Sequence, residues 1–197
     1  MKNNNLISRN LVTKSINQSI AVKKRLLKEN IDDILYAKEL CVNTLKNKGK
    51  IILCGNGGSA SDAHHLATEL LVRLRPKVNR KPIAALSLNL DTTSISACSN
   101  DYSYNIYLSR MLEALGKKED ILIAISTSGN SINILNVLKK SKKLGIKSIS
   151  LLGNKGGKAK KLSNHNIIVN SKTTARIQEA HICIGHILME LIEDDIR

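Results

Sequence analysis

The sequence predicts an α/β fold: a doubly wound, mostly parallel sheet of five strands flanked by helices, with a helical arm before it. Short apolar runs rich in β-branched residues alternate with longer stretches of helical periodicity, as in successive βαβ units. The lengths and β-branched content of these runs are typical of parallel strands buried on both faces. The length of 197 residues suits one domain, with residues 1–48 expected as the arm and 49–197 as the core.

The elements are expected in a regular order along the chain. Residues 6–48 are expected to form two helices because apolar residues recur at helical spacing, and Asn30 or Asp32 is the candidate cap of the second helix. This helical pair has no strand partner, so we expect it to pack on the core or on another subunit. Strands are expected at 51–54, 83–88, 121–126, 147–152 and 166–170. Helices are expected at 60–74, 93–98, 104–115, 131–144 and 174–195.

The charge balance bears on the kind of partner. The chain has 31 Lys and Arg against 16 Asp and Glu, a formal net charge of +15, which is compatible with nucleic acid or with smaller phosphate-bearing partners. Its lysines are scattered along the chain, and it has no Phe or Trp on which bases would stack. We therefore expect a phosphate-bearing small molecule rather than nucleic acid.

Other features concern the compartment. No apolar run approaches the roughly 18 residues of a membrane span, so no membrane partner is expected. The first residues contain no uninterrupted apolar segment of the kind a signal peptide has. The cysteines lack the spacing of a metal site or a disulfide framework, which predicts free thiols in a cytoplasmic protein: Cys41, Cys54, Cys98 and Cys183.

A glycine-rich segment follows the first expected strand and leads into a helix. Glycines there permit positive φ and allow a ligand to approach backbone N–H groups closely. The pattern is neither GxxxxGK[ST] nor GxGxxG, so it does not favour a nucleotide. The alternative is a tight strand–helix turn with no ligand. The candidate residues are Asn56, Gly57, Gly58 and Ser59.

A hydroxyl-rich segment follows the third expected strand. Hydroxyls and free backbone N–H groups at the start of a helix form a site for a phosphate dianion, assisted by the helix dipole. The alternative is ordinary N-capping, for which Ser131 alone would suffice. Four hydroxyls in one loop favour the phosphate site, and they belong to Ser126, Thr127, Ser128 and Ser131.

Two helices carry further candidate side chains. His65 and Glu69 are i,i+4 and share a helix face, so they can bind a divalent metal, act as an acid/base pair or simply form a surface contact. His64 points about 100° away, which favours a structural role. Gln178 and His186 are eight residues apart, a rise of about 12 Å. They serve one site only if their side chains converge or another subunit supplies one of them; otherwise His186 is a packed histidine.

Four segments in order, CGNGGSASDAHHLATEL, SNDYSYN, ISTSGNS and TARIQEAH…H, carry a resemblance to a known family. Over nearly its whole length the chain resembles the bacterial phosphoheptose isomerases of the SIS (sugar isomerase) superfamily. The resemblance implies an SIS fold in a single domain. It also implies conversion of sedoheptulose 7-phosphate to D-glycero-D-manno-heptose 7-phosphate through a cis-enediol. That reaction begins ADP- or GDP-heptose synthesis for lipopolysaccharide or other surface glycans.

The same resemblance implies residue roles, a cofactor and an assembly. Glu69 and His186 would be catalytic, and a homotetramer would carry its active sites at the subunit interfaces. One Zn²⁺ per subunit would be bound by His65, Glu69, Gln178 and His186. The substrate would contact Asn56, Gly57, Gly58, Ser59, Glu69, Asn100, Asp101, Ser126, Thr127, Ser128, Ser131 and Gln178.

The main alternative is a non-catalytic binding module. The chain also resembles the DnaA-initiator-associating protein, an SIS relative whose pattern lacks the acidic residue matching Glu69 and the histidine matching His186. The presence of both residues here favours the enzyme. A sugar-phosphate-sensing SIS regulator would need neither residue, and amino-sugar phosphate isomerases usually carry two SIS repeats. The basic loop at 75–81 matches the family weakly and is expected to be mobile.

Overall fold

A parallel sheet forms the centre of the molecule. The computed structural model describes residues 2–89 and 92–196, with side chains from residue 5 onward. Within these residues the sheet has five strands in the order β2-β1-β3-β4-β5, and every neighbouring pair is parallel. The predicted five-stranded sheet is confirmed. The strands are β1 (Ile51–Cys54), β2 (Ala85–Ser87), β3 (Ile121–Ser126), β4 (Lys147–Gly153) and β5 (His165–Val169).

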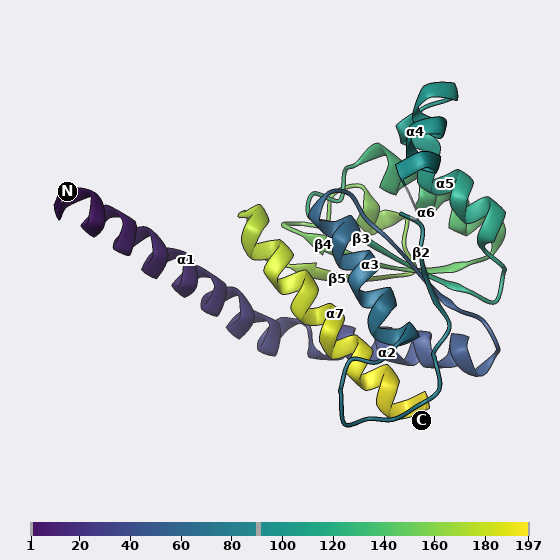
Figure 1. Ribbon diagram of the computed structural model, residues 1–197, viewed down its shortest axis with the longest axis horizontal. Helices are drawn as coiled ribbons and strands as arrows, with labels where there is room; N and C mark the ends of the chain where they lie inside the picture. Colours follow the sequence, from purple (N-terminus) through teal and green to yellow (C-terminus); the bar gives the residue numbers. More distant parts are fainter. Residues whose placement is uncertain (1, 90–91, 197) are drawn as a thin grey trace.

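Helices flank the sheet on both faces (Figure 1). The described residues include α1 (Lys2–Glu29), α2 (Ile31–Lys46), α3 (Gly58–Leu71), α4 (Thr92–Asp101), α5 (Tyr104–Leu115), α6 (Ile132–Leu144), the 3₁₀ turn η1 (Ala159–Lys161) and α7 (Thr174–Ile196). On one face, α2, α3 and α7 bury apolar side chains against the sheet. On the other, α5 and α6 do the same. This two-sided coverage explains why β1 and β3 are buried at every position.

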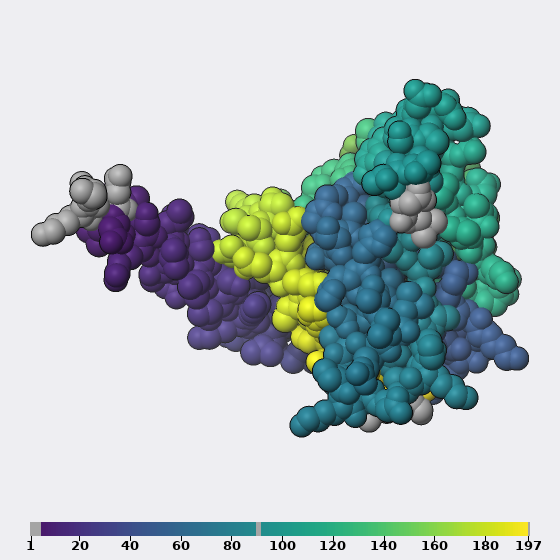
Figure 2. All heavy atoms as spheres, in the orientation of Figure 1, coloured from purple at the N-terminus to yellow at the C-terminus, as the bar shows by residue number. Residues whose placement is uncertain are grey.

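The two N-terminal helices behave differently. α2 packs on the core through buried residues such as Ala37 and Cys41. α1 contributes only Val22 and Leu26 to that cluster, and Arg176 of α7 donates to the carbonyl oxygen of Ser15. The N-terminal part of α1 projects away from the body (Figures 1 and 2). Of the two candidate caps, Asn30 occupies the N-cap position of α2, but its side chain makes no capping hydrogen bond.

None of the described helices combines the length and the apolar character that crossing a membrane requires. The sheet instead determines where a ligand site lies. Because β1 and β3 are adjacent and parallel, the loops that follow them leave the same edge of the sheet. Ligands of doubly wound sheets bind beyond this carboxyl edge. Both loops singled out in the sequence are therefore brought together by the topology.

Candidate active site

The loop after β1 is shaped by glycines. A Cβ at Gly55 would stand 2.3 Å from the carbonyl oxygen of Ser59, so only glycine fits there. Gly57 adopts a φ of +54°, which glycine takes without strain, and α3 begins at the next residue. The Asn89 carboxamide accepts from the Gly55 N–H and donates to the Gly55 carbonyl, both at 3.1 Å. These contacts fix the backbone of the predicted substrate-binding segment.

The hydroxyl-rich loop after β3 is held by its own side chains. The buried Ser126 hydroxyl accepts a hydrogen bond from the Gly129 N–H at 3.1 Å. The Ser128 hydroxyl accepts from the N–H of Asn130, also at 3.1 Å. Ser131 takes the N-cap position of α6 without making a side-chain cap bond. The loop therefore presents hydroxyls beside the positive end of a helix dipole, an arrangement suited to a phosphate group.

The segment after β4, which contains Gly156 and Gly157, packs against the hydroxyl-rich loop. A Cβ at Gly129, where φ is +62°, would stand 2.1 Å from the carbonyl oxygen of Gly156. A Cβ at Gly157 would stand 2.5 Å from the carbonyl oxygen of Ser128. The Ala159 N–H donates to the Gly129 carbonyl at 2.9 Å. Sequence reasoning did not assign this support, although the Gly-Gly pair after β4 was a visible signal.

Amide side chains link the two loops. Asn56 and Asn133 exchange a pair of hydrogen bonds at 2.8 and 2.7 Å, and the Tyr104 hydroxyl donates to the Asn56 Oδ1 at 2.7 Å. Asn133 is buried in the first turn of α6. Asn133 and Tyr104 were not among the predicted site residues. Both nevertheless lie in or directly after the segments that carried the resemblance, which was the signal that could have found them.

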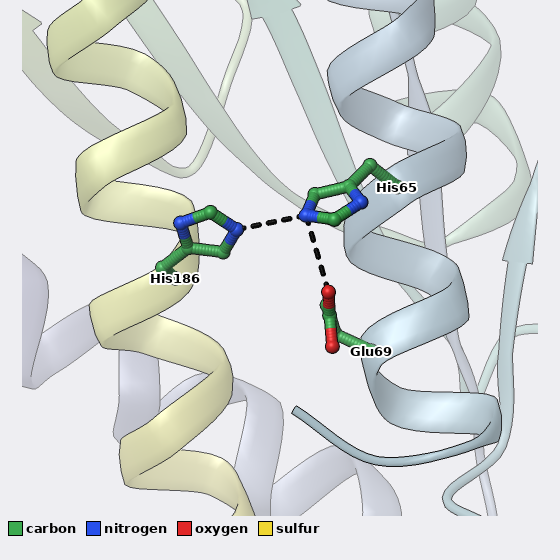
Figure 3. Close-up of side chains that lie close together, drawn as sticks. All are labelled: His65, Glu69 and His186. Carbon is green, nitrogen blue, oxygen red and sulfur yellow. Dashed lines mark hydrogen bonds and ion pairs between the residues drawn. The ribbon is translucent and has the colours of Figure 1, made fainter. Parts of the chain in front are cut away.

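Three side chains from two helices meet further along α3 (Figure 3). His65 Nε2 lies 2.9 Å from His186 Nε2 and 3.1 Å from Glu69 Oε1. His65 and Glu69 come from α3 and His186 from α7. We call them the His/Glu/His group. The structure thus joins His186 to the predicted i,i+4 pair, and the alternative of a packed histidine far from the site does not apply.

The helices approach closely because α7 carries a glycine at the crossing. A Cβ at Gly185 would stand 2.5 Å from Leu66 Cδ1 on α3. Leu66 follows His65 directly and Gly185 precedes His186, so the Leu66 side chain packs on the backbone of α7 right beside the two imidazole-bearing residues. A larger residue at position 185 would clash with the Leu66 side chain, so that either this side chain or the helices would have to move.

The His/Glu/His group has the composition of a metal site. Its ligand atoms all lie within 4.8 Å of one another. Two imidazole nitrogens and one carboxylate oxygen are the protein ligands of one class of catalytic zinc site, with ligand bonds of about 2.0–2.2 Å. Such bonds place tetrahedral ligand atoms about 3.3 Å apart, close to the 2.9 and 3.1 Å measured here. Two of the three ligand separations are therefore close to those of one tetrahedral ion, and the group is a candidate site for a divalent metal.

The remaining predicted residues lie outside the His/Glu/His group. Gln178 lies against the start of α3, with Nε2 2.9 Å from where a Gly58 Cβ would stand. Asn100 and Asp101 end α4, are exposed and bond to each other at 2.9 Å. His64 faces away from the group and bonds through Nε2 to the Asn89 carbonyl, in agreement with its predicted structural role.

Two buried titratable groups of this region are unsuited to acid–base work near neutral pH. Burial raises the pKa of the Cys54 thiol to about 12, so it remains protonated and is a poor nucleophile. Burial lowers the pKa of His181 to about 4, opposed only in part by the backbone of Leu152. Neither ring nitrogen of His181 has a hydrogen-bond partner of normal geometry among the described residues. Neither group is therefore a candidate for acid–base work at the site.

Comparison with known proteins shows the family of the chain. The SIS domain family matches residues 16–153. A phosphoheptose isomerase of Helicobacter pylori (strain P12) is 51% identical over 88% of each chain, and one of Leptospira biflexa is 44% identical over 94% of this chain and 95% of its own. The solved phosphoheptose isomerase of Francisella tularensis superposes with a TM-score of 0.91 at 33% identity, covering 95% of this chain and 98% of that one. The chain belongs to the phosphoheptose isomerase family of SIS-domain proteins.

Proposed function

We propose that the chain interconverts sedoheptulose 7-phosphate and D-glycero-D-manno-heptose 7-phosphate. The observation that carries the proposal is the His/Glu/His group, which places a carboxylate and two imidazoles together in a chain of this family. The hydroxyl-rich loop supports a sugar-phosphate substrate, since it offers donors at a helix N-terminus. The product would enter ADP- or GDP-heptose synthesis for lipopolysaccharide or another surface glycan, in the cytoplasm.

The proton transfers follow from an aldose–ketose isomerisation. Glu69 takes a proton from C1 of the ketose, and the C2 carbonyl oxygen gains a proton, which gives a cis-enediol. Return of a proton to C2 and loss of the proton on the C1 oxygen give the aldose. His186, which reaches the same point from the opposite helix, moves protons between the two oxygens.

The phosphate end of the substrate is assigned to the loop after β3. The proposed contacts are Ser126, Thr127, Ser128 and Ser131. Segment 56–59 and the residues Asn100, Asp101 and Gln178 are proposed to bind the sugar. Because Asn56 is fixed by Asn133 and Tyr104, its amide is preorganised before substrate arrives.

We assign one Zn²⁺ per subunit to His65, Glu69 and His186, with Gln178 as the fourth ligand implied by the family resemblance. Such an ion, when bound, polarises a carbonyl as a Lewis acid. A cation on the Glu69 carboxylate also lowers its basicity, so its roles as ligand and as base oppose each other. Metal affinity and proton transfer must therefore be measured separately.

The assembly is proposed to be a homotetramer with active sites at the subunit interfaces. The support is the surface of α1, whose apolar side chains are exposed along its length: Leu6, Ile7, Leu11, Val12, Ile16, Ile20 and Leu27. Exposed apolar surface of this kind marks an interaction site. We also propose a single SIS domain over 1–197, with 1–48 as arm and 49–197 as core, although α2 buries its apolar face in that core.

The test is an NMR assay of the purified chain with sedoheptulose 7-phosphate in D₂O, with and without added zinc. Formation of the heptose phosphate with solvent deuterium at C2 is the expected result, since the enediol accepts its proton from an exchangeable carboxyl. An unrelated sugar phosphate serves as the control for general base catalysis. A folded chain that binds the substrate without turnover in either condition would favour the binding-module alternative.

A further inference from the structure

A buried ion pair links the far ends of α3 and α7. Arg80, in the loop after α3, donates from Nε to Glu193 Oε1 at 2.8 Å, and the two side chains are only 3% and 1% exposed. The loop at 75–81, expected to be mobile, is thus anchored on α7. Figure 1 shows this loop passing around the C-terminal end of that helix.

The same guanidinium caps α3. Its Nη2 donates to the carbonyl oxygen of Glu69 at 2.7 Å, and its Nη1 donates to that of Leu70 at 2.9 Å. The last carbonyl groups of a helix lack partners within the helix, and a cation there also opposes the negative end of the dipole. Arg80 therefore holds the backbone of Glu69, a member of the His/Glu/His group, while its Nε is bound to α7.

The ion pair lies in line with the His/Glu/His group along both helices. Glu193 follows His186 by seven residues, which places it on the same helix face about 10.5 Å further on. α3 and α7 are thus in contact at successive levels: at Gly58 and Gln178, at Leu66 and Gly185, and through Arg80 at Glu193. His65 and His186 flank the second of these levels, and Glu69 lies one helical turn further along α3, toward the third.

We propose that Arg80 is a positioning residue, which keeps α3 and α7 at the separation that the His/Glu/His group requires. The inference rests on the proposed function of that group as the metal-binding and reacting centre. A metal site and a reacting centre both tolerate displacements of well under about 1 Å. A contact that holds the backbone of one member and the helix of another acts on that separation directly.

A neighbouring arginine provides a matched comparison. Arg75 lies in the same loop and donates to the other oxygen of Glu193 at 2.7 Å. Among the described residues its remaining hydrogen bonds also go to α7, at Asp194 and at the Glu190 carbonyl. Arg75 thus shares the loop, the charge and the acidic partner of Arg80 without joining α7 to α3.

The experiment compares Arg80→Lys with Arg75→Lys. Lysine keeps the charge but cannot bridge the α3 carbonyls and Glu193 at once. For Arg80→Lys we expect zinc affinity, measured by competition with a chelator, to fall about tenfold or more, as for other partners of metal ligands. We expect kcat to fall with it while KM for the sugar phosphate changes less than about twofold, because only the reacting end is disturbed. Arg75→Lys should leave zinc affinity and kcat within about twofold of wild type.

Further measurements keep the two proposals separable. In the metal-free chains, the imidazole NMR signals of His65 and His186 should shift in Arg80→Lys and remain in place in Arg75→Lys. If the wild type binds no zinc, the proposed metal site fails while these signals still test Arg80. If Arg80→Lys does not fold, Glu193→Gln replaces it, since it removes the charge across the helices and leaves the α3 cap; it should show the same losses. The inference would be overturned if Arg80→Lys, or Glu193→Gln in its place, kept the wild-type imidazole signals and zinc affinity. It would also be overturned if Arg75→Lys changed both as much as Arg80→Lys does.

Discussion

The two halves of the candidate active site are built differently. The phosphate half consists of loops at the ends of β1 and β3, and its shape is set by backbone contacts, glycines and short side chains. The reacting half consists of three long side chains whose meeting depends on how closely α3 and α7 pack. The first half follows from short motifs at the ends of neighbouring parallel strands, whereas the second depends on the packing of two helices distant in the sequence. Substitutions in the two halves should therefore separate binding from turnover.

The largest expected effect is on turnover, from Glu69→Gln. The amide keeps the size of the side chain but cannot take a proton from carbon, so kcat should fall by about 10³-fold, within the range of a lost general base. KM should change little because the phosphate half is untouched. Steady-state kinetics of the folded variant measure both quantities. Retained turnover would remove Glu69 as the base.

The next effect is on stability in acid and comes from His181, which lies on α7 one turn before the glycine beside His186. The folded-state pKa of His181 is about 4, below the ordinary value of 6.5, because burial disfavours the charged ring. As the pH falls from 6.5 toward 4, the unfolded chain binds this proton first, so stability is lost in that window, by up to about 3 kcal/mol. The loops at 55–61 and 126–131 contain no titratable side chain.

His181→Leu should remove this loss, since leucine has nothing to protonate and suits an apolar site. Urea unfolding at neutral pH and near pH 5, at one fixed protein concentration, measures it. The variant should lose less stability than wild type between the two conditions. An equal loss in both chains would mean that other groups cause the acid sensitivity.

The smallest expected effect is in the phosphate half, from Ser128→Ala. Removing one hydroxyl donor from a charged ligand costs about 1.5 kcal/mol, or roughly a tenfold rise in KM, with kcat nearly unchanged. Kinetics with sedoheptulose 7-phosphate provide the measurement, and weak binding of phosphate-free sedoheptulose is the control, which the variant should not alter. A KM equal to that of wild type would exclude Ser128 from phosphate binding.

The placement of the loops in the proposed phosphate half could be predicted from the sequence, and the arrangement of the reacting half only in part. Hydroxyls after an apolar run and glycines after another are local signals, and parallel strands bring them to one edge. The i,i+4 spacing of His65 and Glu69 was also local. Placing His186 beside them required the packing of α7 on α3, a contact across 121 residues. Gly185 allows that close packing, but a glycine in a helix does not by itself indicate which other helix packs against it.

The exact ends of helices and strands, and the anchoring of loops, were also only partly predictable from the sequence. The helix expected from residue 60 begins at Gly58, because the positive φ of Gly57 turns the chain directly into α3. The strand expected at 83–88 is confined to Ala85–Ser87, because the sheet pairs only these residues with β1. The anchoring of the loop at 75–81 was not foreseen, since Arg80 and Glu193 are 113 residues apart.

The backbone contact between Gly129 and the Gly156–Gly157 pair has a consequence for protein engineering. The ligand-facing loop and the loop behind it touch main chain to main chain, at positions where neither tolerates a Cβ. A graft of residues 126–131 onto another sheet would transfer the hydroxyls without the surface that gives them their curvature. Residues 154–159 must be transplanted with them, so the smallest portable unit of this phosphate site is two crossover segments rather than one motif.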